Sequence, residues 1–81
     1  VLWPNPVEST LNITLNINNL DNYTIELYDL KGVNLKEIFT GNLDLGDSNL
    51  FYNTDNLSSG VYLIKISSDN GINKIMKFIK R

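Results

Sequence analysis

Apolar and polar residues alternate along most of this chain, which is the pattern of β-strands. The clearest run spans residues 11–17, where an aliphatic residue at every odd position is separated from the next by Asn or Thr. Side chains of a strand point alternately to its two faces, so such a run predicts a strand with one buried face. The residues expected to face inward are Leu11, Ile13, Leu15 and Ile17.

Similar runs, separated by turn residues, continue to the end of the chain. We expect further strands at residues 23–29, 33–40, 50–53, 61–67 and 72–80. Tight turns are expected at Asp29–Gly32, Leu57–Gly60 and Ser68–Gly71, and a loop at 41–49. Pro4 and Pro6 exclude a helix at the start and predict a short edge strand or a stiff entry segment. The whole pattern predicts an all-β fold, an antiparallel Greek-key-like sandwich of about seven short strands.

The last of these runs has apolar residues on both faces. Met76 and Phe78 share one face, Ile75 and Ile79 share the other, and lysines fall on both. We therefore expect this strand to be partly buried and partly exposed, and its mixed pattern is compatible with a β-bulge.

Composition agrees with strands joined by tight turns, and it limits the chemistry. The 81 residues suffice for one domain, residues 1–81. Alanine is absent, whereas Asn, a turn former, occurs 13 times. The lack of both His and Cys excludes disulfides, thiolate zinc sites and Ser-His or Cys-His catalysis. Since Val1 is not a methionine, we expect a fragment of a larger protein, with any signal peptide upstream.

Charge is distributed unevenly around a net value of −2. The last eight residues contain Lys74, Lys77, Lys80 and Arg81 and no acid, while all nine acids lie before them. This basic end is too short for a general nucleic-acid-binding face, and no apolar run is long enough to span a bilayer. Two interpretations remain open for it: a docking feature, or an edge strand protected by lysines.

Other candidate sites are weaker. Asp44 with Asp47, and Asp55 near Asn53, lack the spacing of a calcium loop, so we interpret them as solvated loop acids. The sequence therefore predicts no metal, no cofactor and no catalytic residue. The aromatic residues allow an alternative function, a carbohydrate-binding module with a sugar-stacking platform, although Tyr62 alternates with aliphatic residues and is better interpreted as core. The platform would use Trp3, Tyr23, Tyr28, Tyr52 and Tyr62.

Taken in order, several short motifs resemble the C-terminal sorting domain of the type IX secretion system (Por secretion system), type A. The first half contains Trp3-Pro4-Asn5-Pro6-Val7, Leu11-Asn12-Ile13 and Ile25-Glu26-Leu27-Tyr28-Asp29 followed by Gly32. The second half contains Leu57-Ser58-Ser59-Gly60-Val61-Tyr62 and the ending Lys77-Phe78-Ile79-Lys80. The resemblance covers essentially the whole chain. One departure is Trp3, where the family usually has Tyr, so an aromatic residue is kept.

This resemblance implies a non-catalytic signal of Bacteroidetes-type bacteria that directs an upstream cargo from the periplasm across the outer membrane to the cell surface. It implies contacts with an outer-membrane β-barrel shuttle and translocon, and a sortase-like peptidase acting near or upstream of residue 1. We expect a monomer that binds no nucleic acid. The basic last strand is our candidate for partner recognition, through Lys74, Lys77, Phe78, Ile79 and Lys80. The motif residues with an expected structural role are Pro4, Asn5, Pro6, Gly32, Leu57, Gly60 and Tyr62.

Overall fold

The fold is a sandwich of two antiparallel sheets, as the alternation predicts. The computed structural model describes residues 1–81 and contains seven strands and no helix. No part of the chain thus forms a helix that could cross a membrane. The strands are β1 (Leu2–Trp3), β2 (Thr10–Ile17), β3 (Asn22–Asp29), β4 (Asn34–Asn42), β5 (Gly46–Asn53), β6 (Gly60–Ser68) and β7 (Asn73–Lys80).

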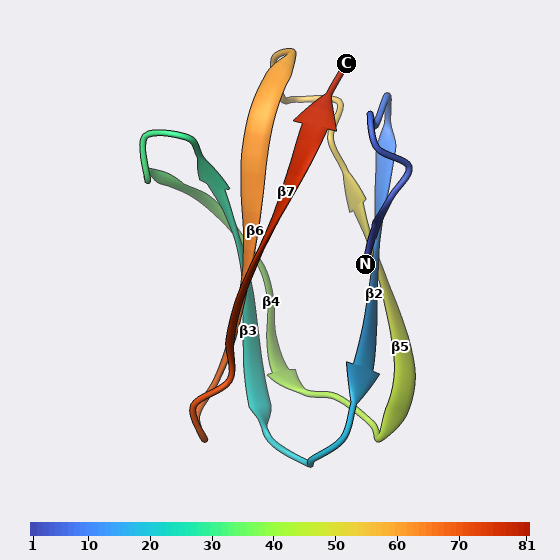
Figure 1. The fold of residues 1–81 in the computed structure, drawn as a ribbon, viewed down its shortest axis with the longest axis vertical. Helices are drawn as coiled ribbons and strands as arrows, with labels where there is room; N and C mark the ends of the chain where they lie inside the picture. The colour runs from blue at the N-terminus through green and yellow to red at the C-terminus, as the bar shows by residue number, and fades with distance from the viewer.

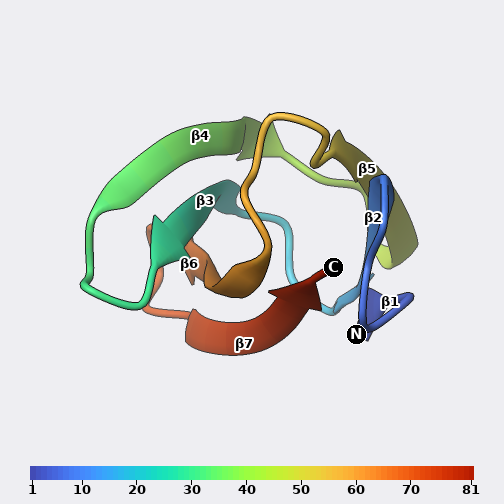
Figure 2. The same ribbon diagram turned by 90° about the horizontal axis from the view of Figure 1, so that it is seen from above.

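The chain crosses repeatedly between the two sheets. One sheet has three strands in the order β1-β2-β5, and the other has four in the order β4-β3-β6-β7 (Figure 1). The view from above shows the two sheets as facing layers, with β7 and β1 at the same side of the sandwich (Figure 2). Consecutive strands β2 and β3 lie in different sheets, as do β4 and β5, which gives the Greek-key character.

The core lies between the sheets and is built from the inward positions of the alternating runs. The odd residues of β2, which the sequence assigned to the inner face, are all buried. Burial of aliphatic and aromatic side chains stabilises the sandwich by about 25 cal/mol per Å² of apolar surface. The buried apolar cluster is Val7, Leu11, Ile13, Leu15, Ile17, Tyr23, Ile25, Leu27, Leu43, Tyr62, Ile64, Ile66 and Phe78.

Two of the expected loops differ from the structure. The predicted loop at 41–49 is mostly strand, since β4 continues to Asn42 and β5 already begins at Gly46. The second turn is formed at Thr54–Leu57, where the Leu57 N–H donates to the Thr54 carbonyl at 2.9 Å. Gly60 is therefore not a turn residue. It is the first residue of β6, paired with Lys80.

The predicted bulge also lies elsewhere. The β6–β7 pair keeps its register from Gly60–Lys80 to Ser67–Asn73 without interruption. The irregularities fall in the β3–β4 pair, between Ile25 and Glu26 and between Leu27 and Tyr28. A bulge increases the local twist, which suits β4 because this strand forms the outer edge of its sheet.

Candidate functional site

The last strand, β7, has one buried face and one exposed face, although both are partly apolar. Phe78 is fully buried, and its ring stacks on that of Tyr62 with centroids 5.6 Å apart. Ile75 and Ile79, on the opposite face, are 61% and 44% exposed. The prediction of a strand with two apolar faces is thus confirmed, and only one of these faces can meet a partner.

The structure divides the five candidate recognition residues between these two faces. Lys77 and Ile79 lie on the exposed face, on alternate positions from Ile75. Lys74, Phe78 and Lys80 lie on the inner face, where they pair with Ile66, Tyr62 and Gly60 of β6. Lys74 is exposed at the open end of the sandwich. Phe78 and Lys80 are buried, so in the folded domain they are not part of a recognition surface.

Lys80 is buried because residues 5–8, which we call the N-terminal clasp, close over the end of β7. The Lys80 ammonium donates a hydrogen bond to the Glu8 carbonyl oxygen, and only 7% of the residue is exposed. Val7 forms an isolated parallel bridge with Lys80: its N–H donates to the Ile79 carbonyl at 2.8 Å, and the Arg81 N–H donates to the Val7 carbonyl at 2.9 Å. The Arg81 guanidinium lies 3.7 Å from the Glu8 carboxylate, both on exposed side chains.

The remaining motif residues have structural roles that can be stated from their contacts. Asn5 belongs to the clasp and accepts a hydrogen bond from β7. Gly32 closes the β3–β4 turn at a φ of +86°, where its N–H donates to the Asp29 carbonyl at 3.1 Å. The Tyr62 hydroxyl donates to the Ser58 carbonyl at 2.7 Å, which fixes the connection before β6, and Leu57 packs against the core. Pro4 and Pro6 are exposed.

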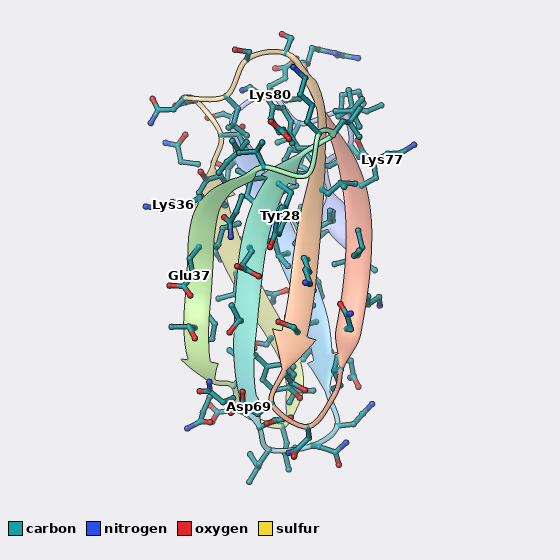
Figure 3. The ribbon with its side chains drawn as sticks, turned by 90° about the vertical axis from the view of Figure 1, so that its left-hand side faces the viewer. Tyr28, Lys36, Glu37, Asp69, Lys77 and Lys80 are labelled. Atoms are coloured by element: carbon teal, nitrogen blue, oxygen red, sulfur yellow. The ribbon has the colours of Figure 1, made fainter.

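The exposed face of β7 is continuous with the outer face of β6 and β3. Cross-strand pairs place Val61 beside Ile79, Leu63 beside Lys77, and Lys65 beside Ile75. Tyr28 of β3 follows next to Leu63, and Figure 3 shows it near the middle of this sheet face with Lys77 at one edge.

A shallow hollow of about 260 Å³ lies on this face of the sheet. It is lined by Tyr28, Gly32, Leu63, Lys65 and Ile75. We call Tyr28, Val61, Leu63, Ile75, Lys77 and Ile79 the β7 outer patch.

The patch is apolar at its centre and basic at its rim. An exposed apolar surface of this kind suits contact with another protein, because burial of the aliphatic side chains favours binding while charges at the rim guide approach. Within the patch Lys77 carries positive charge, and Lys65 lies at its border, where Glu26 faces it across the strands. The sequence prediction of recognition residues included Lys77 and Ile79 but not Ile75 of the same strand. It also missed Val61, Leu63 and Tyr28, because only the strand order places β6 beside β7 and β3 beside β6.

The aromatic side chains do not form one platform. Tyr23 and Tyr62 are buried, and Tyr52 packs against the core. Tyr28 lies on the outer face of the four-stranded sheet, while Trp3 lies in β1 of the other sheet. The arrangement therefore lacks the shared aromatic surface that the carbohydrate-binding alternative requires.

The acidic residues interact with polar neighbours on the surface. Asp47 lies in β5, where its Oδ1 accepts a hydrogen bond of 2.9 Å from the Asn16 amide. Asp55 accepts one of 2.9 Å from the Ser9 hydroxyl, and its backbone N–H donates to Asn53 Oδ1 at 2.8 Å. No cluster of three or more acidic side chains that could hold a metal ion is formed.

Comparison with known protein families identifies the family of this chain. The family model described as a secretion system C-terminal sorting domain matches residues 1–81, the whole chain. No curated protein and no solved structure gives a significant match.

Proposed function

The chain belongs to the family of secretion system C-terminal sorting domains, and we propose that it presents the β7 outer patch to the secretion machinery. Its function as the C-terminal sorting signal of the type IX secretion system follows from this membership, as does export to the cell surface or beyond. Such sorting signals are not known to be catalytic. The carbohydrate-binding alternative has no support in the comparison or in the placement of the aromatic residues.

The exposure of Ile75 and Ile79 on the last strand is the observation that supports the proposed surface. A last strand with a purely structural role needs only one apolar face. Here the inner face already fills the core with Phe78, and two further isoleucines remain at 61% and 44% exposure beside Lys77. Such a surface would add apolar burial to the binding free energy, with Lys77 favouring an acidic partner surface.

We further propose the order of contacts. The domain would direct the cargo through the outer-membrane translocon, and the β7 outer patch would then meet the outer-membrane β-barrel shuttle that receives it. A sortase-like peptidase would then act near or upstream of residue 1 and leave the cargo at the cell surface. In this proposal Phe78 and Lys80 contribute indirectly, since their burial holds β7 in place and fixes the direction of Lys77 and Ile79.

Two variants at opposite edges of the same sheet test the apolar part. The test variant is Ile75→Thr with Ile79→Thr, and the control is Val33→Thr with Leu35→Thr, where the wild-type side chains are 52% and 42% exposed. Each would be fused behind a signal peptide and a reporter in a host that carries the type IX system. We expect the test variant to lose most reporter secretion and the control to keep it, with both domains folded. Normal secretion of the folded test variant would refute the patch.

The charge part is tested in the same way. Lys77→Glu reverses the charge in the patch, while Lys36→Glu reverses it on the edge strand β4 at the other side of the sheet (Figure 3). We expect slower secretion only for Lys77→Glu. Equal rates for the two variants would show that charge at the patch does not guide docking.

A further inference from the structure

The sandwich is open along the half of β2 that β1 does not cover. β1 pairs with β2 only at Leu2–Ile13 and Trp3–Asn12. One more ladder pair follows: the Val1 ammonium donates to the Thr14 carbonyl at 2.8 Å, and the Thr14 N–H donates to the Val1 carbonyl at 2.9 Å. In Figure 1 the N-terminus lies about half-way along β2, and the rest of this edge has no neighbouring strand.

The uncovered edge is well suited to pair with another strand. Hydrogen-bonded pairs alternate in an antiparallel ladder, so the next residue of β2 whose N–H and C=O face this side is Asn16. On its other side Asn16 pairs with Asp47 of β5, and no strand pairs with it here. Residues 11–19 contain neither a charge nor a proline. Two devices that commonly protect an open edge, charged side chains and proline on the edge strand itself, are therefore missing from β2.

A cleft lies directly beside this edge, between the two sheets. Its volume is about 570 Å³. The aliphatic part of its lining comes from Val1, from β2 and β6, and from the β6–β7 turn, where Ile72 is 41% exposed. Apolar side chains entering the cleft would remove this surface from water. The aliphatic lining residues are Val1, Leu15, Ile17, Ile66 and Ile72.

The Val1 ammonium is partly desolvated and lies in the field of the Lys74 charge. Burial, and then the neighbouring charge of Lys74, lower the pKa of the Val1 ammonium below its usual value of 8.0. A peptide N–H at the same position would donate the same hydrogen bond to Thr14 without either cost. A C-terminal sorting signal is joined at this end to the protein that it exports.

We propose that the residues joining the exported protein to Val1 continue β1 along β2 and fill the cleft. The register of β1 then fixes their positions. In the β1–β2 pair the numbers of two opposite residues always add up to 15, and the same rule continues before Val1. The residue directly before Val1 lies opposite Leu15 with an apolar side chain in the cleft. The second residue before it pairs with Asn16 through backbone hydrogen bonds, and the third lies opposite Ile17, again facing inward. The junction with the cargo is thus an integral strand of the sandwich. This edge is separate from the β7 outer patch, so either proposal can fail without the other.

Two extensions of equal composition test the proposed register. One adds Thr-Ile-Thr-Ile before Val1, which places both isoleucines inward. The other adds Ile-Thr-Ile-Thr, which places them outward, and it also removes the charge at Val1. We expect the first extension to raise the melting temperature above that of the second by at least about 4 °C. The Asn16 amide should exchange with solvent at least tenfold more slowly in the first extension than in the 81-residue chain, as expected for a newly paired ladder N–H.

Two results would overturn the proposal. One is that both extended chains melt at the same temperature and leave the exchange of the Asn16 amide unchanged. The other is that the 81-residue chain sediments as a dimer with its Asn16 amide already protected, since a second copy would then cover this edge. Neither measurement involves secretion, so the result does not depend on which surface the machinery recognises.

Discussion

The Oδ1 atom of Asn5 accepts a hydrogen bond of 2.9 Å from the backbone N–H of Ile79, 74 residues further along the chain. This N–H faces the open side of β7, where no neighbouring strand could satisfy it. The side chain of Asn5 therefore takes the place of a strand at the end of the sheet, and it links the Pro-Asn-Pro segment to the terminal Lys-Phe-Ile-Lys segment.

Loss of this bond should loosen the end of β7. For Asn5→Ala we expect a decrease in the free energy of unfolding of about 0.5–1.5 kcal/mol, the usual net contribution of one hydrogen bond. Urea denaturation would measure this, and the Ile79 amide should exchange faster. The control is Asn73→Ala in the same strand, whose exposed side chain makes no hydrogen bond, and it should unfold at the parent's midpoint. An unchanged midpoint for both variants would show that the clasp contributes nothing through Asn5.

Lys77 and Lys80 should respond differently to the same substitution. Lys80→Glu removes a hydrogen bond from a buried ammonium and places a carboxylate beside the Glu8 carbonyl. We expect it to cost at least about 1.5–3 kcal/mol, the range for hydrogen bonds to charged groups. Lys77→Glu, at an exposed position, should change stability by only about 0.5 kcal/mol. Thermal unfolding of the two variants decides the matter, and equal melting temperatures would contradict the burial of Lys80.

Gly32 should resist substitution because of its backbone and not because of its surroundings. Its φ of +86° is in the left-handed region, and a Cβ built there meets no atom within 4 Å. Gly32→Ala should therefore cost about 1–2 kcal/mol from backbone strain alone. Lys31→Ala, in the same turn, is the control, since its N–H bond to Asp29 is unaffected. Chemical denaturation would compare the two, and equal midpoints would show that the turn tolerates a Cβ.

Asp21 should make the domain less stable in acid. Desolvation, the largest single influence, raises the pKa of its carboxyl. Hydrogen bonds from the Ser68 side chain, from the backbone of Asn22 and Asn70 and from the Asn70 side chain together outweigh it, so the net pKa lies below 3.8. A carboxyl with a lowered pKa in the folded state stabilises the fold above its unfolded pKa. This contribution is lost as the pH falls through the folded pKa.

The variant Asp21→Asn isolates this effect. The parent should lose more stability than Asp21→Asn between pH 5 and lower pH values, because only the parent carries the carboxyl that bridges the Asn22 and Asn70 backbones. Urea midpoints measured at several pH values would show it. Parallel pH profiles for parent and variant would mean that Asp21 has the same pKa in both states.

The sequence alone determined the fold class and the part of the core that β2 contributes. Strict alternation identified the inner face of β2, because its polar and apolar residues never exchange faces. The turn at Asp29–Gly32 was equally clear, since Asp at its start and Gly at its end each have a local conformational reason. The order of the short motifs likewise sufficed to indicate the sorting-domain family, which the match over residues 1–81 confirmed.

Only the tertiary structure decided which parts of β7 are accessible. Alternation assigns a buried face only when the two faces differ, and in β7 both carry isoleucine or phenylalanine as well as lysine. Alternation also fails for the first half of β5, because residues 46–49 are all polar or glycine. These residues form a strand only because they pair with residues 14–17 of β2. Lys80 is buried by a segment more than 70 residues away, through Glu8 and Val7. Such contacts leave no local pattern, because they depend on how two distant ends of the chain meet when the sheets pack.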